Sequence, residues 1–547
     1  MLISILILTL ITLVVLGFSG IFKFLIFSKS KSVKSFDFIY GIIFLTTISL
    51  ISNLFIPLKK ISFITCLVGL FFFVLFFFNK KNNINIIKIL FLNIFILFIC
   101  YGNELVYDSG LYHLQTIKYN YEYKTIFGLS NLEPRLGMNS SFHSLISIFN
   151  FPIFGYNVIY FFNIVIYSFF INLVIDKSFR EEKTAYYTLS FSLVFIFLYS
   201  YLHPWKNGTI LNNIGSPEVD TIAMIFFIIS FVLFLAFLDS RDNKYFNLLL
   251  CCTMITLTIK LSYLSVSLFI IYAFLISKKI KIFSKLNFFL LFSFLLWLIK
   301  NITLTGCLLF PIKQTCYNFI WALGPNNVEN YNNIIRSFNR TMPNHLKFSD
   351  FDYTLNSYEW IFPWIKNYFV KTEFLIISSI MIIGSIFFIV FIKTIEFMKH
   401  KKFIYNYNYF IIFLILLFSI FVWLQSPEIR FGYGSIISLA TFLLTISFLN
   451  LKKFIIKNSQ FSNLLIIIFF IMIIDNLENS KLLMKNPFIR EFDYSKINLL
   501  YLTNNYKVYR PNDGVFCNFF PGFCSYQSFD VNITRKNNYI YIINNWQ

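Results

Sequence analysis

The chain has 547 residues, of which 57% are hydrophobic and only 13% are charged. Soluble domains carry roughly a quarter of their residues as charged side chains, so this composition excludes a cytosolic enzyme, a secreted disulfide scaffold and a DNA-binding domain. The net charge of +21 does not indicate a nucleic-acid partner, because the lysines separate apolar segments and form no basic stripe. We therefore expect a polytopic protein whose main partner is the lipid bilayer.

A helix needs about twenty mostly apolar residues to cross a bilayer. Segments of this kind are 2–22, 36–56, 61–78, 84–101, 155–175, 184–203, 220–238, 286–303, 373–397, 405–424, 435–450 and 460–475. Segment 246–276 is too long for one crossing and contains Lys260, which predicts two short helices with a break there. Residues 139–152 are too short to cross and predict a half helix ended by Pro152. The expected fold class is an all-α polytopic membrane protein with about 12–14 transmembrane helices.

Lysine-rich loops alternate along the chain with loops that are poor in lysine, and the positive-inside rule places the lysine-rich loops in the cytoplasm. All long polar segments then lie on the outer side, where we expect the function to be. Six parts follow: N-terminal transmembrane helices (1–101), an outer-face catalytic-type loop and half helix (102–152), central transmembrane helices (153–303), an outer loop with a cysteine pair (304–372), C-terminal transmembrane helices (373–475) and an extracytoplasmic C-terminal segment (476–547).

Four of the eight cysteines form two close pairs in the predicted outer segments, Cys307 with Cys316 and Cys517 with Cys524. An oxidising compartment outside the membrane favours local disulfides at these spacings. The alternative is four free thiols. Neither spacing suits a zinc site, and no histidine cluster accompanies the pairs.

The outer loop after the fourth span places Glu104, Asp108 and His113 within ten residues. Carboxylates at a membrane boundary are candidates for function, because they are costly to keep there. Such a group can take a proton from an acceptor hydroxyl, or hold a divalent cation such as Mg²⁺ or Mn²⁺ against a phosphate leaving group. The alternative is structural: Asp108 could cap a helix that runs to about Tyr123.

Two arginines on the same side could hold an anion. Arg135 and Arg430 are fixed cations with paired donors that suit phosphate or carboxylate. The structural alternatives are an interfacial Arg135 that reaches lipid headgroups and a local ion pair between Arg430 and Glu428.

Further charges lie at or inside the predicted spans. Glu218 and Asp220 begin another span, where capping of the helix is the simpler interpretation. Lys260 and Lys300 are expected as cations inside the bundle or, for Lys300, as a side chain that extends outward to the interface.

Two motifs carry a resemblance to a known family. Asp-Ser-Gly-Leu-Tyr-His-Leu-Gln at 108–115 and Asn-Leu-x-x-Arg-Leu-Gly-x-Asn-Ser-Ser at 131–141, with later stretches at 300–311 and 426–434, resemble a family of large polytopic bacterial envelope membrane proteins. That family in turn is similar to glycosyltransferases of the GT-C class, which use polyprenyl-phosphate sugars at the outer leaflet. The resemblance covers most of the chain, from about residue 84 to the C-terminal cysteine pair.

The GT-C resemblance implies a catalytic acid in an outer loop, which maps onto Asp108, with Glu104 as second candidate and His113 assisting. Substrate contacts are then expected from Arg135, Arg430, Tyr112, Gln115 and Asn139, and a metal, if used, from Asp108. The implied partners are a polyprenyl-(di)phosphate-linked sugar and an envelope glycan acceptor. The implied location is the bacterial inner membrane.

The expected function is therefore transfer of a sugar from a polyprenyl-(di)phosphate carrier to an envelope glycan or lipid at the outer face. One alternative is a lipid-linked oligosaccharide polymerase or ligase, for which paired outer arginines would matter more than Asp108. Another is a lipid-linked glycan transporter, but the chain has no internal repeat and its polar residues gather on one face. A transferase requires Asp108 and an arginine to converge on one outer-facing site.

Overall fold

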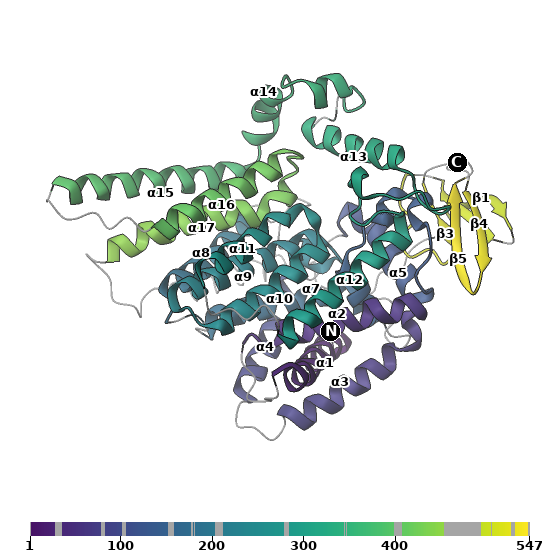
Figure 1. Cartoon of the computed structure of the whole chain (residues 1–547), viewed down its shortest axis with the longest axis horizontal. Helices are drawn as coiled ribbons and strands as arrows, with labels where there is room; N and C mark the ends of the chain where they lie inside the picture. Colours follow the sequence, from purple (N-terminus) through teal and green to yellow (C-terminus); the bar gives the residue numbers. More distant parts are fainter. Residues whose placement is uncertain are drawn as a thin grey trace.

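The structure is a computed structural model of the whole chain. It describes residues 2–27, 35–77, 83–100, 105–150, 158–176, 179, 181–202, 212–277, 284–343, 345, 347–398, 407–452, 494–504, 506–512, 514–526 and 531–544. Most of these residues are helical, and the helices pack side by side in a bundle (Figure 1). Strands occur only near the C-terminal end of the described part.

Thirteen helices of the described residues form the bundle. They are α1 (Leu2–Phe27), α2 (Asp37–Phe55), α3 (Ser62–Phe77), α4 (Asn83–Cys100), α7 (Phe162–Ile175), α8 (Lys183–Leu202), α9 (Val219–Ser240), α10 (Asn243–Ile259), α11 (Ser267–Ile276), α12 (Lys285–Thr305), α15 (Glu373–Met398), α16 (Tyr407–Leu424) and α17 (Ile429–Lys452). Eight helical segments are long and apolar enough to cross a membrane, and three further apolar helices are shorter. The chain is thus a multi-pass, mostly helical membrane protein.

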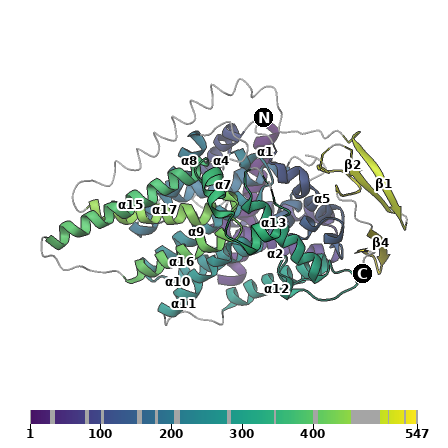
Figure 2. The same ribbon diagram turned by 90° about the horizontal axis from the view of Figure 1, so that it is seen from above.

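Helix α9 lies at the centre of the bundle. Its most apolar 18-residue window is 94% buried, whereas the corresponding windows of α15 and α16 are only 22% buried. Apolar residues all around a helix indicate burial in a large protein or in lipid. The lipid-facing helices α15 and α16 extend from one side of the bundle, and α17 packs between them and the centre (Figure 2).

The break predicted inside 246–276 is confirmed. Helix α10 ends at Ile259, Lys260 has an extended backbone (φ −153°, ψ 116°), and the 3-10 helix η7 (Leu261–Val266) leads into α11. The span predicted at 435–450 begins earlier, at Ile429. In its first turns Gly432 lies against the Trp423 ring, where a Cβ atom would be 2.8 Å from ring atoms. The span predicted at 460–475 lies outside the described residues.

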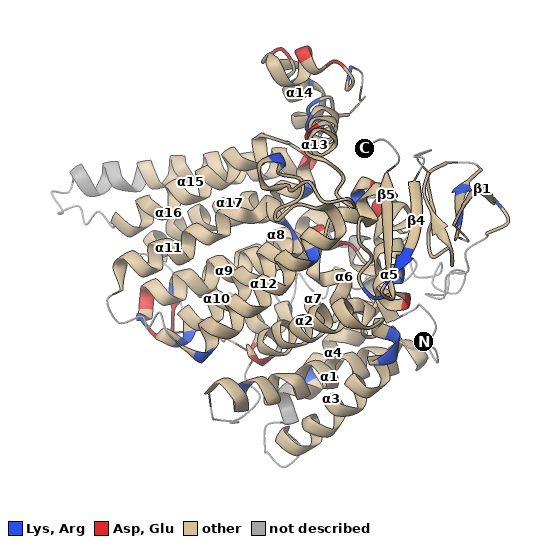
Figure 3. Cartoon of the chain, turned by 45° about the vertical axis from the view of Figure 1, so that its right-hand side comes forward, with Lys and Arg blue, Asp and Glu red and all other residues tan. Residues whose placement is uncertain are grey.

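Further segments cover one end of the bundle, the end that the lysine pattern predicts to be the outer side. Their helices are a π-helix, η2 (Ser109–His113), then α5 (Leu114–Glu122), α6 (Ser141–Ser147), α13 (Pro325–Arg340) and α14 (Ile361–Trp364), with the 3-10 helices η1 (Leu58–Lys60), η3 (Leu129–Asn131), η4 (Pro134–Gly137), η6 (Asn212–Gly215) and η8 (Lys313–Thr315) and the π-helices η9 (Asp352–Asn356) and η10 (Ile365–Phe369). The short α6 occupies the first half of the segment 139–152 predicted as a half helix. Lys, Arg, Asp and Glu residues lie mainly at helix ends and in these segments (Figure 3).

The expectation of an all-α chain is wrong for the C-terminal segment. It contains β1 (Ile497–Thr503), β2 (Tyr506–Pro511), β3 (Phe523–Cys524), β4 (Val531–Lys536) and β5 (Tyr539–Asn544). Strand β2 pairs antiparallel with β1 and parallel with β3, while β4 and β5 form an antiparallel hairpin. Alternate residues Val531 and Ile533 are buried beneath this hairpin, which is the two-residue period of a half-buried strand.

Candidate functional site

Asp108 lies on the helical segment that precedes α5, and its carboxylate faces another part of the chain. The interpretation of Asp108 as a helix cap is wrong, because its backbone is helical (φ −63°, ψ −24°) and its side chain accepts no capping hydrogen bond. Instead, Asp108 Oδ2 accepts a hydrogen bond of 2.9 Å from Nη1 of Arg430. The π-helix η2 follows directly, and π-turns inside helices often occur at functional sites.

Arg430 lies in the first turn of α17 and contacts three carboxylates. Its guanidinium is 2.9 Å from Asp108, 3.2 Å from Glu428 and 3.7 Å from Asp220. The local pair with Glu428 that the sequence suggested is therefore present, but it is one part of a larger group. The link between residues 108 and 430 joins segments 322 positions apart.

Asp220 and Glu218, at the start of α9, divide capping and ion pairing between them. The Glu218 carboxylate caps the helix by accepting a hydrogen bond of 3.1 Å from the backbone N–H of Asp220. The Asp220 carboxylate instead forms an ion pair with Lys260 at the break after α10. The Lys260 ammonium also lies 3.6 Å from the centre of the Phe431 ring, beside Arg430.

These contacts define one group of charges, which we call the outer ion cluster. Its members come from the η2 helix and from the ends of α9, α10 and α17: Asp108, Glu218, Asp220, Lys260, Glu428 and Arg430. Four acids therefore share two cations. Since charges in a buried site are tolerated only when compensated, such an excess of carboxylates favours protonation of some of them.

The pKa directions outside the spans agree with that expectation. Burial, reinforced by the negative charge of Asp220, raises the pKa of Glu218 to about 8, so this carboxyl is neutral at pH 7. Burial also raises the pKa of Glu428, against the opposing effect of Arg430. Burial acts the same way on Asp108, but the Arg430 charge and hydrogen bond hold its pKa below the ordinary value. Asp108 thus stays ionised beside Arg430, whereas Glu218 and Glu428 are shifted toward the neutral form.

His113 lies behind the cluster in a fully buried position. Burial lowers its pKa to about 4, so the ring is neutral at pH 7. Its Nδ1 atom is 3.8 Å from Oε2 of Glu218, too far for a hydrogen bond, and both groups are neutral, so the contact is not an ion pair. The ring of His143, which sequence reasoning missed, lies 4.8 Å away.

Three members of the cluster are partly exposed. The side chains of Asp108 and Arg430 are each 22% exposed and that of Lys260 is 17% exposed, whereas those of Asp220 and Glu428 are 3% and 7% exposed. Asp108 and Arg430 thus form the most exposed ion pair of the cluster.

Arg135 forms a separate contact. It is 3.1 Å from Glu133 and donates a hydrogen bond to the Tyr526 hydroxyl, with its side chain 31% exposed. Burial raises the pKa of Tyr331, and the charges of Arg135 and Asp108 both act on this residue, which places Tyr331 between them. Arg135 is thus near the outer ion cluster but is not a member of it.

The other predicted site residues differ in position. Tyr112 is half-buried, with its ring centre 4.3 Å from that of His113. Asn139 is buried and exchanges hydrogen bonds with Trp297, donating to its carbonyl at 3.1 Å and accepting from its indole at 2.7 Å. Glu104 lies outside the described residues. We keep Tyr112 beside the cluster and assign Asn139 to packing.

The C-terminal disulfide loop rests on the helix that carries Asp108. The structure joins Cys517 to Cys524, and Cys307 to Cys316 in the other outer loop. Asn518 donates a backbone hydrogen bond of 3.0 Å to Gly110, and a Cβ atom at Gly110 would lie 2.8 Å from the Phe516 ring. The loop therefore packs directly against the η2 helix.

Two side chains of α5 fasten this loop. Gln115 donates to the carbonyl of Asn518 at 2.6 Å, so its amide is committed to the loop and not to a substrate. Lys118, which sequence reasoning did not single out, donates to the carbonyls of Phe520 and Gly522 at 2.6 Å each. Burial lowers the pKa of Lys118 to about 7. The loop thus supports the η2 helix from the outer side.

The position of Lys300 differs from the one expected from the sequence. It does not extend outward; its side chain is buried, and its ammonium donates to Asn53 at 2.9 Å and to Asn120 and Ser144 at 2.8 Å each. Three oxygen acceptors satisfy an ammonium group without a carboxylate. Lys300 therefore ties α2, α5 and α6 together under the outer loops.

The donor set of the cluster does not fit a divalent cation. Among the described residues, no group of three or more His, Cys, Asp or Glu side chains is arranged to bind a metal. Asp108 and Asp220 face Arg430 and Lys260, which already supply the positive charge that a cation would bring. The metal expected at Asp108 therefore stays a prediction.

Comparisons with known proteins give a family and no function. The family model described as a domain of unknown function, DUF8201, matches residues 1–437, which include all members of the outer ion cluster. Searches of curated proteins and of solved structures found no match. A match over more than half of the chain places it in that family.

Proposed function

Because the chain belongs to the DUF8201 family, whose description assigns no activity, we propose its function from the outer ion cluster. We propose that it is a GT-C-like glycosyltransferase of a bacterial inner membrane. It would transfer a sugar from a polyprenyl-(di)phosphate carrier to an envelope glycan or lipid at the outer face.

One observation carries this proposal: an ionised carboxylate and an arginine from distant segments meet in a partly exposed pair above a buried group of charges. The arginine suits a phosphate, and the carboxylate suits the proton of an acceptor hydroxyl. A transfer from a phosphate-linked sugar needs both groups in one place. The transferase hypothesis requires Asp108 and an arginine to converge on one site, and the Asp108–Arg430 pair meets this requirement.

The ion pair suggests how donor binding prepares the base. A donor phosphate that approaches Arg430 competes with Asp108 for the guanidinium donors. Because Arg430 lowers the pKa of Asp108, loss of that contact raises the pKa and makes the carboxylate a stronger base. Asp108 would thus gain basicity when the donor is bound. The neutral Glu218 carboxyl and His113 ring add no competing charge.

The transfer step then balances without a further reactant. The acceptor oxygen attacks the anomeric carbon, the bond from that carbon to the phosphate oxygen breaks, and Asp108 takes the acceptor proton. The leaving (di)phosphate carries away the bonding electron pair, and Arg430 stabilises its charge. Asp220, which is itself paired with Lys260, would hold Arg430 in place from behind.

The test is replacement of the two reacting groups in the chromosomal gene. We expect Asp108→Asn to remove one defined sugar from the surface glycan, measured by gel and mass spectrometry, because Asn cannot accept the proton. Arg430→Lys keeps the charge but loses the paired donors, so we expect partial loss. The matched control is Asp352→Asn, an exposed outer carboxylate hydrogen-bonded only locally to Asn356 among the described residues.

Protein amount in the membrane fraction is measured for every variant. Full glycan in the Asp108→Asn strain, with normal protein amount, would contradict the transferase. Shortened chains built from complete repeat units would instead indicate the polymerase alternative. Accumulation of complete lipid-linked glycan on the inner leaflet would indicate transport.

A further inference from the structure

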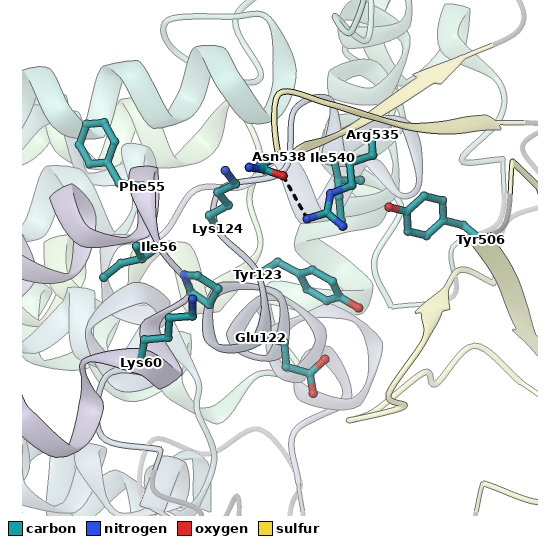
Figure 4. A pocket seen from close by; sticks show the side chains of 11 residues that line it. Phe55, Ile56, Lys60, Glu122, Tyr123, Lys124, Tyr506, Arg535, Asn538 and Ile540 are labelled. Carbon is teal, nitrogen blue, oxygen red and sulfur yellow. Dashed lines mark hydrogen bonds between the residues drawn. The ribbon is translucent and has the colours of Figure 1, made fainter.

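A second charged site lies at the other end of α5. A cavity of about 550 Å³ opens between the end of α2, the end of α5 and the C-terminal strands (Figure 4). Residues 108–122 form a continuous helical stretch, which at 1.5 Å per residue separates this cavity from Asp108 by roughly 20 Å. We call it the boundary pocket.

Three cations and one acid are among the residues that line the boundary pocket. The cations are Lys60, Lys124 and Arg535, and the acid is Glu122. Within the described residues, none of the three cations is within 4.0 Å of a carboxylate, so their charge is not compensated as it is in the outer ion cluster. The Lys124 ammonium lies 3.6 Å from the centre of the Tyr539 ring, and Arg535 donates to Asn538 at 3.4 Å. The pocket therefore has an excess of positive charge, which attracts an anion.

The opposite wall of the pocket is apolar and belongs to a membrane span. Phe55, at the end of α2, lines the pocket and is 65% exposed. Next to it, Phe63 and Ile64 on α3 are 58% and 60% exposed, which is the pattern of a lipid-facing surface. The pocket thus begins where the hydrocarbon region ends.

Hydrogen bonds connect the two walls of the boundary pocket. Tyr539 of β5 donates a hydrogen bond of 3.1 Å to the carbonyl of Leu54, and the backbone N–H of Thr125 donates one of 2.8 Å to Asn53. Strand β5 and the segment after α5 are therefore held against the end of α2. The cations are presented at a fixed position relative to the membrane surface.

We infer that the boundary pocket binds the phosphate of a membrane lipid, with Lys60, Lys124 and Arg535 around the phosphate and the hydrocarbon chain along Phe55. An anionic headgroup with an apolar tail is the ligand class that matches cations beside an exposed aromatic residue at the membrane boundary. Arg535 offers paired donors to phosphate, and the two lysines add charge. This inference is independent of the proposed transferase activity.

The test uses the purified full-length protein in detergent micelles. Binding of a phosphatidylglycerol is measured by native mass spectrometry and compared with a phosphatidylcholine of the same chain length. The test variant is the double substitution Lys60→Gln with Arg535→Gln. The matched control is Lys59→Gln with Lys536→Gln, which removes the same charge from the adjacent exposed residues that do not line the pocket.

We expect phosphatidylglycerol to bind better than phosphatidylcholine, and we expect the test variant to lose binding about tenfold while the control binds as wild type. Both double variants replace exposed side chains, so folding is preserved, and gel filtration checks it. Equal loss in both variants would overturn the inference, because it would show a diffuse basic surface. Competition by millimolar inorganic phosphate or tighter binding of an acidic oligosaccharide, trigalacturonate, would also overturn it by assigning the pocket to a soluble anion.

Discussion

The structure has two charged regions that differ in how far their charges are compensated. In the outer ion cluster, Arg430 and Lys260 are enclosed by carboxylates and buried protein. In the boundary pocket, Lys60, Lys124 and Arg535 face open space with one nearby acid. Buried charges depend on their partners for stability, whereas exposed charges contribute little to folding and remain available to ligands. The first region thus contributes to the stability of the fold, whereas the cations of the second remain available to a ligand.

The largest expected effect comes from a substitution in the outer ion cluster, where cations and carboxylates are paired. Arg430→Gln leaves Asp108 and Asp220 without their shared cation, and removing one partner of a buried ion pair costs about 3–5 kcal/mol. Arg535→Gln, in the boundary pocket, should change the free energy of unfolding by no more than about 0.5 kcal/mol. Thermal unfolding in detergent measures both. Equal losses would contradict the distinction between the two regions.

A double-mutant cycle measures the interaction between Asp220 and Lys260 in the outer ion cluster. Asp220→Asn leaves Lys260 without its carboxylate, and Lys260→Met leaves Asp220 with only its 3.7 Å contact to Arg430, so each should destabilise the protein by about 3 kcal/mol. The double substitution should cost less than the sum by about 1–3 kcal/mol, because no buried charge is then left alone. Strict additivity would show that the two side chains do not interact.

A pH series tests the neutral carboxyl in the cluster. The pKa of Glu218 is raised from 4.5 to about 8 in the folded protein, so its stabilising effect is complete below pH 4.5 and is lost as the pH rises through 8. His113 acts oppositely: its pKa is lowered from 6.5 to about 4, so its stabilising effect is present above 6.5 and is lost as the pH falls through 4.

The two effects partly cancel between pH 4.5 and 6.5, which leaves pH 6.5–8 as the window for Glu218. Above pH 7 the lowered pKa of Lys118 acts in the opposite direction, so the test compares two proteins that share this effect. With rising pH in that window, the wild type should lose stability relative to Glu218→Gln, which keeps the helix cap and cannot ionise. The melting temperature in detergent, measured at several pH values, reports this slope. Identical slopes in both proteins would mean that Glu218 is already ionised at pH 7.

The smallest expected effect concerns salt. Raising NaCl from 0.1 to 1 M shortens the screening length from about 10 to 3 Å, which weakens interactions of exposed charges but hardly affects buried ones. Phosphatidylglycerol binding at the boundary pocket should therefore fall several-fold, while the melting temperature should change little. Salt-independent lipid binding would indicate that the apolar wall at Phe55, and not the cations, holds the lipid.

Sequence reasoning succeeded where the signal is local. Apolar segments of about twenty residues predicted the bundle, and Lys260 inside an apolar run predicted the break after α10. Sequence reasoning failed where a residue has a pattern typical of a local role but contacts a residue that is distant in the sequence. Asp108 has the pattern of a helix cap, yet it pairs with Arg430, and Lys300 has the pattern of an interfacial lysine, yet it is buried among three oxygen acceptors.

The C-terminal segment shows the same limit. Its alternating residues at 531–536 have the period of a strand, but this weak signal follows a chain dominated by apolar helices, and all-α was the expectation. Lys118 gave no signal, because two of its three acceptors are the backbone carbonyls of Phe520 and Gly522, about 400 positions away, and the third is the nearby Gln115 side chain. Backbone acceptors carry no sequence identity that could be read.

The sequence by itself determined that the chain is a multi-pass membrane protein, because hydrophobic length acts locally, and the positions of its lysines predicted the side on which each loop lies. It also named Asp108 and Arg430 as separate candidates. Only the tertiary structure decided that they meet, that four acids share two cations around them, and that three uncompensated cations surround a pocket at the membrane boundary. The physical reason is that charge compensation depends on distances between helix ends, which are set by packing of the whole bundle.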